Sequence, residues 1–278
     1  MNEQIPILSE ILDNLTFIFD NPEVTYSLIP IKSHKNPIYE LTLTNQTKNT
    51  SEVYIIKRLQ IESANIEYNS IKLLKKQNMN VPSVLLYKNP FIIQEKIIGT
   101  DLCDYINENL IGKKDLSEVP NEIKDNLYNA IKLLAKWLAK FHKNNIIPKD
   151  DEGKIIVLNK GDARLKNFII NTSNDKLYGI DFEESHEGNY IEDISWVCCS
   201  LIDTNPGIFE MEEPLHKIEL LNLFLREYFT LNHDFKFSFS DFTRSLIENL
   251  NKVIIRRELN FGLLNKNTFL SKIIKEID

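Results

Sequence analysis

The sequence predicts an α+β protein in which a small antiparallel β-sheet part with one inserted helix precedes a larger, mainly α-helical part. Two observations support this. Up to about residue 98, β-branched and aromatic runs alternate with polar breaks, which is typical of strands. Beyond that point apolar residues recur three or four apart, which is typical of helices. At 278 residues and 42% hydrophobic content, the chain is long enough for two cores, and we expect domains at 1–98 and 99–278.

Each element of the first part has its own signal. Residues 6–19 carry apolar side chains at helical spacing after an opening proline, so a short amphipathic helix is expected. Three β-branched runs between 24 and 59 predict antiparallel strands. Helical spacing returns over 62–78, and two further strands are expected at 81–87 and 89–97, each beside a proline or asparagine break. The prediction is five strands with one helix after the third.

The second part is mainly helical. Apolar residues three or four apart predict a long helix over 121–145, which ends at an Asn-Asn pair followed by a proline. Short strands and further helices follow; the strands are expected at 155–158, 167–171 and 177–182, and the helices at 191–203, 214–230, 240–258 and 267–277.

Composition limits the kinds of partner. A net charge of -7 argues against a general nucleic-acid or anionic-membrane binder, which needs a basic surface. Cys103, Cys198 and Cys199 show no metal-ligand spacing and fit a reducing compartment. No cationic-then-apolar leader and no run of about 18 apolar residues is present, so we expect a cytoplasmic protein. The oligomeric state is not predicted.

Polar residues interrupt two apolar strands in "KGDARLKNFII" and "YGIDFEE". Asp162 and Asn167 lie five apart before one strand, and Asp181 lies at the end of the next. If the strands pair as a hairpin, Asn167 and Asp181 come together and offer oxygen ligands to a hard cation such as Mg²⁺. Asp162 then remains as a base or orienting group, and nearby Arg164 or Lys166 would lower its pKa.

The pattern D-x-x-x-x-N, then an apolar strand, then apolar-apolar-D-F resembles the catalytic loop and metal-binding segment of the protein-kinase-like superfamily. The Gly-Asp pair and short spacing are most similar to the aminoglycoside and choline phosphotransferase branch. The resemblance implies a protein-kinase-like two-lobed fold that uses ATP and Mg²⁺. It makes Asp162 the catalytic aspartate and Asn167 and Asp181 the magnesium ligands. Lys160 stands where the family usually has histidine.

The resemblance extends to the first part of the chain. "EVYIIKRL" is similar to the third strand of the small lobe, which makes Lys57 the lysine that contacts phosphate. On the following helix Glu67 shares a face with apolar residues, and a carboxylate there needs a cationic partner such as Lys57. Glu62 is the competing partner.

Two more segments complete the resemblance. "FIIQEKIIGTDL" is similar to the strand that leads into the kinase hinge. The resemblance implies that Glu95 and Ile97 offer backbone groups to adenine and that Gln94 guards the back of the pocket. "GNYIEDISWVCCSL" is similar to the helix that braces the catalytic loop, with Asp193 as the bracing residue.

The resemblance implies transfer of the γ-phosphate of ATP to a hydroxyl of a small molecule. Asp193 follows Asp181 by only twelve positions, which leaves no room for the long activation segment that protein kinases use as a docking platform. An atypical protein kinase with a shortened segment and a non-catalytic nucleotide-binding module remain alternatives. Residues 183–213, called the acidic stretch below, contain nine Asp or Glu and no Lys or Arg. They predict a cationic acceptor, aminoglycoside- or choline-like, or else a solvated acidic face.

Overall fold

The computed structural model describes residues 10, 23–33, 35–148, 155–205, 207–210, 214–260 and 262–265. Apart from Glu10, the helix expected at 6–19 lies outside these residues, and so does the helix expected at 267–277. The chain divides into two compact units, of which the first comprises Met1–Lys72 and Pro82–Ile97 and the second Leu73–Val81 and Ile98–Asp278. The roles assigned to residues 1–98 and 99–278 stay predictions.

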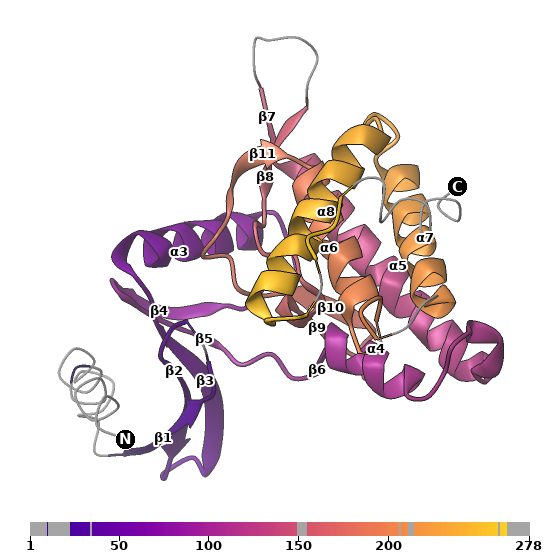
Figure 1. Cartoon of the computed structure of the whole chain (residues 1–278). Coiled ribbons are helices and arrows are strands. Elements are labelled where there is room, and N and C mark those ends of the chain that lie inside the picture. The colour runs from indigo at the N-terminus through magenta and orange to yellow at the C-terminus, as the bar shows by residue number, and fades with distance from the viewer. Residues whose placement is uncertain are drawn as a thin grey trace. The chain divides into compact units, whose positions relative to one another are not determined.

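The first unit is built on a five-stranded antiparallel sheet (Figure 1). In chain order its elements are β1 (Val24–Ile31), β2 (Ile38–Asn45), β3 (Thr50–Arg58), most of α3 (Ile61–Lys76), β4 (Val84–Lys88) and β5 (Phe91–Glu95); the end of α3, from Leu73 on, belongs to the second unit. The strand order is β1-β2-β3-β5-β4. Leu41 of β2, Ile56 of β3 and Ile93 of β5 belong to one buried cluster, which is the core of the sheet. The predicted five strands with one helix after the third are confirmed.

Helix α3 packs on this sheet through its small and apolar side chains. Ala64 joins Leu59 and Ile92 in a second buried cluster. Tyr68 of α3 stacks on Tyr87 of β4 with ring centroids 4.1 Å apart. The same helical spacing that buries Ala64 also turns the side chain of Glu67 inward, where it is fully buried.

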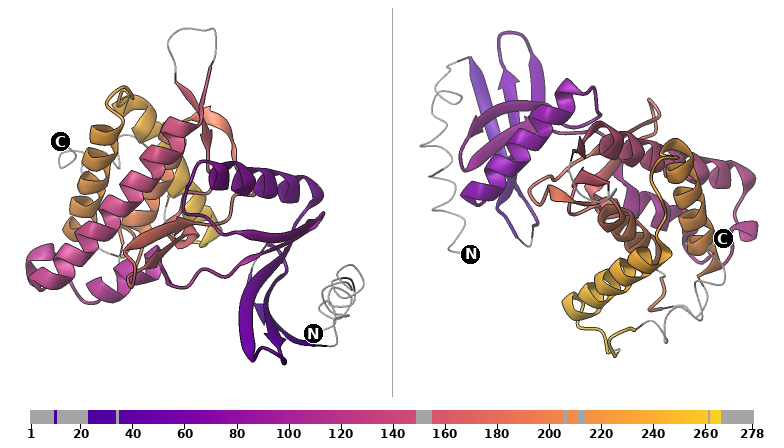
Figure 2. Two further views of the ribbon diagram at one scale, coloured as in Figure 1. Left: turned by 180° about the vertical axis from the view of Figure 1, so that it is seen from behind. Right: turned by 90° about the horizontal axis from the view of Figure 1, so that it is seen from above.

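The second unit is mainly helical. Its helices are α4 (Leu102–Leu110), α5 (Asn121–Asn144), α6 (Ile191–Asp203), α7 (Leu215–Leu231) and α8 (Phe239–Arg256), with short 3-10 turns η1 (Leu116–Glu118) and η2 (Leu165–Asn167). Helix α7 packs on α5, and α6 packs on both α7 and α8 (Figure 2). Helices α5 to α8 agree with the sequence prediction to within about two residues. No helix within the described ranges is both long and apolar enough to cross a membrane.

Two three-stranded sheets hold the loops of the second unit. One has the order β10-β9-β6, from β6 (Thr100–Asp101), β9 (Phe168–Asn171) and β10 (Lys176–Gly179). The other has the order β11-β8-β7, from β7 (Ile146–Ile147), β8 (Ile156–Asn159) and β11 (His186–Asn189). The sequence did not predict β6, β7 or β11, because two-residue strands and the polar run His-Glu-Gly-Asn lack apolar alternation. Strands β8 and β9 flank the loop 160–167.

Candidate active site

The hairpin of β9 and β10 brings two predicted metal ligands to the same end. Gly179 lies opposite Phe168, and the N–H of Ile180 donates to the carbonyl of Asn167 at 3.0 Å. The pairing of these strands is as predicted, but β10 ends at Gly179, before Asp181. Asp181 has a φ of 64°, a left-handed conformation that is uncommon outside glycine. Such strain concentrates at functional sites.

Asn167 is held so that its amide oxygen is the available ligand atom. The side chain is 5% exposed, and its Nδ2 donates to the carbonyl of Asp162 at 3.0 Å. With the nitrogen bound in this way, Oδ1 lies on the opposite edge of the planar amide group. An amide oxygen from Asn167 and a carboxylate from Asp181 are a donor set that Mg²⁺ accepts. The residues therefore fit a magnesium ion.

Lys160 fastens the two motif segments to each other. Its side chain is fully buried, and Nζ donates to the backbone carbonyls of Asp162 at 2.8 Å and Asp181 at 2.7 Å. The ammonium also lies 5.7 Å from the ring centroid of Phe168 and 5.1 Å from that of Phe182. The resemblance places a histidine here, and nothing in the sequence indicated that a lysine would bridge both loops.

Asp162 is capped by a guanidinium. Arg164 donates from Nε and from one terminal nitrogen to the two carboxylate oxygens of Asp162. Burial alone would raise the pKa of Asp162, but the hydrogen bonds and charge of Arg164, with the charges of Lys160 and Lys166, outweigh burial. The pKa of Asp162 therefore lies below its ordinary value, and the carboxylate is ionised at neutral pH.

Asp193 braces the loop from helix α6, as predicted. Its carboxylate accepts the backbone N–H groups of Lys160 at 2.6 Å and Gly161 at 3.0 Å. His142 of α5 contacts the same carboxylate at 3.1 Å and the hydroxyl of Tyr228 at 2.7 Å. His142 and Tyr228 were not predicted, because on their helices they carry the spacing of ordinary core residues. The loop is thus fixed by a buried chain of polar groups.

Gly161 lets the loop turn sharply beside Glu184. Its φ is 85°, and a Cβ there would lie 2.1 Å from the carbonyl oxygen of Glu184. A side chain is therefore excluded at this position both by conformation and by space.

Lys57 and Glu67 form a buried ion pair in the first unit. Nζ of Lys57 lies 2.8 Å from Oε1 of Glu67, and the two side chains are 6% and 0% exposed. The competing residue, Glu62, is exposed in the first turn of α3, where its carboxylate interacts favourably with the positive end of the helix dipole. The pair present in the structure is the one that the helix face indicated.

The three residues predicted to contact adenine lie at and after the end of β5. Gln94 is buried, and its Oε1 has no hydrogen-bond partner among the residues that the structure describes. The N–H of Glu95 donates to the carbonyl of Ser83 at 2.8 Å, and its carboxylate accepts the N–H of Ser83 at 3.0 Å. Ile97 is buried. Their contacts with adenine stay predictions.

Much of the acidic stretch is engaged within the fold. Arg257 of the segment after α8 pairs with both Asp203 and Glu210, at 2.6 and 2.8 Å. Glu192 pairs with His186 at 3.0 Å, and its carboxylate also accepts the N–H of Asn189 at 3.0 Å. Asp193 of the same stretch is already committed to the loop amides. These four carboxylates are committed within the fold, and the acidic wall for a cationic acceptor stays a prediction.

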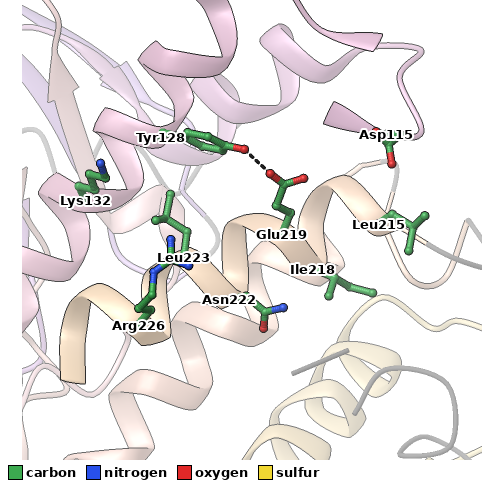
Figure 3. Close-up of a pocket in the computed structure, with 9 residues that line it drawn as sticks. All are labelled: Asp115, Tyr128, Lys132, Leu215, Ile218, Glu219, Asn222, Leu223 and Arg226. Carbon is green, nitrogen blue, oxygen red and sulfur yellow. Dashed lines mark hydrogen bonds between the residues drawn. The ribbon is translucent and has the colours of Figure 1, made fainter. Parts of the chain in front are cut away.

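A pocket of about 460 Å³ between α5 and α7 contains none of the predicted site residues (Figure 3). The hydroxyl of Tyr128 donates to Glu219 across it. Burial, and then this carboxylate, raise the pKa of Tyr128. Lys132 and Arg226 also line the pocket, so its walls carry both signs of charge.

Asp101, Cys103 and Asp104 also bring three metal-ligand atoms together, within 4.8 Å of one another. This group is the N-terminus of α4, where Asp101 accepts the N–H of Asp104 at 2.9 Å. Burial, followed by the two carboxylates, raises the pKa of Cys103 to about 11. The group is explained by helix capping.

No family model matches the chain, and no curated protein matches its sequence. Solved structures do match. A glucosamine kinase in complex with glucosamine, ADP and inorganic phosphate has a TM-score of 0.60 at 11% identity, over 93% of this chain and 84% of that chain. The chain has the fold of glucosamine kinase. A second crystal form of glucosamine kinase has a TM-score of 0.57 at 11% identity, over 88% and 79% of the two chains.

A Plasmodium vivax ethanolamine kinase also matches, at 16% identity over 100% of this chain and 85% of that one. Its TM-score of 0.46 is too low to support an inference. The likeness to glucosamine kinase supports the predicted kinase-like mixture of a small antiparallel sheet with helices. Membership of the aminoglycoside and choline phosphotransferase branch stays a prediction.

Proposed function

We propose that the protein is an ATP- and magnesium-dependent phosphotransferase that acts on a hydroxyl of a small molecule. The observation that carries the proposal is the fastening of Asp162 and Asp181 by the buried ammonium of Lys160, with Asn167 bound to the same loop. A fold shared with a glucosamine kinase that was solved with its sugar and ADP supports the same reaction class.

The reaction needs one base and a fixed acceptor. The acceptor oxygen forms a bond to the γ-phosphorus, the bond from that phosphorus to the bridging oxygen of ADP breaks, and the hydroxyl proton passes to Asp162. Because the pKa of Asp162 is lowered, its carboxylate is ionised and can accept a hydrogen bond from the hydroxyl. The bracing by Asp193 holds that carboxylate in place, and positioning is the main contribution of protein groups to phosphoryl transfer.

The remaining residues are assigned to the nucleotide. Asn167 and Asp181 would hold Mg²⁺, which supplies neutralisation of phosphate charge. Lys57 would contact the phosphates that are not transferred, with Glu67 fixing its Nζ. The buried Oε1 of Gln94 fits a nearby donor such as the exocyclic amine of adenine, because a buried acceptor without a partner is costly.

A small acceptor is favoured over a protein acceptor. Of the eleven residues between Asp181 and Asp193, four form β11, which pairs with β8, and the next helix begins at Ile191. This segment supports the loop and offers no length for a peptide-docking platform.

ADP release tests the proposal. The assay uses purified protein, ATP and Mg²⁺ with a panel of small hydroxyl compounds, and with casein as a protein acceptor. We expect release to rise with at least one small compound, and to fall by orders of magnitude in Asp162→Asn but not in the exposed control Asp125→Asn. Release driven only by casein would favour the protein-kinase alternative. Nucleotide binding without any Asp162-dependent turnover would favour a non-catalytic module.

A further inference from the structure

The pocket of about 460 Å³ between α5 and α7 is a groove with an apolar floor and charged walls, and we call it the α5–α7 groove (Figure 3). Ile218 and Leu223 line it and are only 5% and 6% exposed. Leu215, which also lines it, is 41% exposed. An apolar centre surrounded by polar side chains is the usual composition of a protein–protein interface.

One row of α7 side chains forms the open edge of this groove. Leu215, Glu219, Asn222 and Arg226 follow one another by four, three and four positions, which places them on one face of the helix. Three of them are exposed and Asn222 is half-buried. The other faces of α7 pack on α5 and α6. The row is therefore a surface on which a further helix can lie.

Charges of opposite sign lie toward opposite ends of the groove. Asp115 and Glu219 lie toward one end, and Lys132 and Arg226 toward the other (Figure 3). Glu219 and Arg226 are seven residues apart, which is about 10.5 Å along a helix. Side chains of one helix pair at spacings of three or four residues, so these two do not neutralise each other.

Neighbouring charges do not cancel this separation. Near the acidic end the charges of Lys124 and Asp125 offset each other, and near the basic end those of Lys136 and Glu227 do so. None of these four residues lines the groove. Lys217 is fully buried on the opposite side of α7. Each end of the groove therefore keeps its own sign of charge.

The charged groups of the groove can still bind a partner. The hydroxyl of Tyr128 donates to Oε1 of Glu219, and no described residue donates to the second carboxylate oxygen. The side chains of Lys132 and Arg226 make no hydrogen bond or ion pair with any residue that the structure describes. Both cations and one carboxylate oxygen are thus available for contacts across an interface.

We propose that the α5–α7 groove binds the same groove of a second copy of this chain, with the two α7 helices antiparallel about a two-fold axis beside Asn222. The axis places Glu219 opposite Arg226 of the partner subunit, and symmetry forms this contact twice. A surface with opposite charges at its two ends is complementary to itself in this arrangement, whereas parallel helices would bring like charges together. This self-complementarity favours a second copy over an unrelated partner. The dimer does not depend on the proposed phosphotransferase activity.

Charge reversal tests the proposal by sedimentation velocity of the full chain over a range of concentrations. Wild type should show a concentration-dependent dimer that added salt weakens. Glu219→Arg and Arg226→Glu each place like charges at both symmetric contacts. Each should therefore raise the Kd of the dimer about 100-fold, or 10-fold per contact. The control Glu248→Arg reverses an exposed carboxylate on α8, outside the groove, and should leave the Kd unchanged.

Mixing the two reversed variants decides whether these residues face each other. An equimolar mixture of Glu219→Arg and Arg226→Glu restores opposite charges across the interface, so it should dimerise as wild type does. The double variant should do so as well. Since only folded chains can be rescued in this way, recovery also excludes a folding defect. Lys132→Glu removes no contact with a described residue, and it should weaken the dimer even if a Glu219 variant does not fold.

Three results overturn the proposal. Wild type that stays monomeric at every concentration shows that a second copy does not bind the groove, and leaves it to another partner. A dimer with the same Kd in Arg226→Glu and Lys132→Glu as in wild type forms through another surface. Folded single variants that are monomeric alone and also monomeric when mixed show that Glu219 does not lie opposite Arg226 of the partner subunit.

Discussion

Replacing Lys160 by methionine tests how the motif segments are held. Methionine has a similar length and no charge, so it fills the space between Phe168 and Phe182 while removing every hydrogen bond of the ammonium. The backbone carbonyls of Asp162 and Asp181 would each lose a charged donor. Lys160 is a positioning residue, since it acts through the backbone of residues proposed to touch substrate or metal.

The expected change in the free energy of unfolding follows from two lost hydrogen bonds and from the removal of a buried charge. An unsatisfied buried carbonyl costs about 1–3 kcal/mol, so two cost about 2–6 kcal/mol. Removing an ammonium from a fully buried site relieves part of its desolvation penalty. We expect the free energy of unfolding to fall by about 2–4 kcal/mol in total. At about 2–4 °C per kcal/mol for a chain of this size, Tm should fall by about 4–16 °C.

The assay pairs thermal unfolding with magnesium-dependent nucleotide binding, measured well below Tm. A second buried lysine provides the control. Lys217 donates to Asn107 and Thr204, and burial lowers its pKa to about 8. In Lys217→Met we expect a changed Tm with normal binding of ATP and Mg²⁺. In Lys160→Met we expect both to fall, with binding weakened by about 10-fold or more.

The expected difference between the two variants can be refuted plainly. If Lys160→Met binds ATP and Mg²⁺ as wild type does at a temperature where both are folded, the bridge does not position the site. Lys160→His restores the residue type that the resemblance expects, and it should recover more binding than methionine does.

The remaining predictions concern the other site residues. Asp162→Asn should leave nucleotide binding nearly intact while abolishing most turnover, whereas Asp181→Asn should weaken magnesium-dependent binding too; calorimetry beside ADP release separates them. Lys57→Ala should weaken ATP use and Glu67→Ala should do so less, and a double-mutant cycle should show coupling; additive effects would contradict the pairing. The lowered pKa of Asp162 gives stability that is present above its ordinary value of 3.8 and is lost as pH falls through the lower folded value. In Arg164→Gln burial dominates, so the acid limb of the pH–rate profile should move to higher pH; an unmoved limb counts against the cap.

Local patterns were sufficient for much of the fold. The apolar spacing of Asn121–Asn144 predicted a helix that the structure contains to within one residue, and the β-branched runs predicted five strands in the first unit. The buried face of α3 indicated Glu67 as the partner of Lys57. In each case the signal is the periodicity of burial, because one face of a helix is buried every 3.6 residues and one face of a strand every 2 residues.

What the sequence did not show depends on packing between distant segments. Lys160 reads as one residue of a basic loop, and its bridge to Asp181 exists only because β8 and β10 are brought together by the fold. The left-handed conformation of Asp181 has no signature in composition. Trp196 likewise reads as a core residue of α6, and its contact with Lys252 requires the packing of α6 on α8.

The most direct measurement of the central claim is calorimetric titration of the protein with ATP in the presence and absence of Mg²⁺. It needs no knowledge of the acceptor. If Asn167 and Asp181 hold magnesium, ATP should bind weakly without the metal, because phosphate charge then faces Asp162 and Asp181 without neutralisation. Binding should tighten by at least about 10-fold with Mg²⁺ in wild type and much less in Asp181→Asn. Equal affinity for ATP with and without Mg²⁺ would contradict the account.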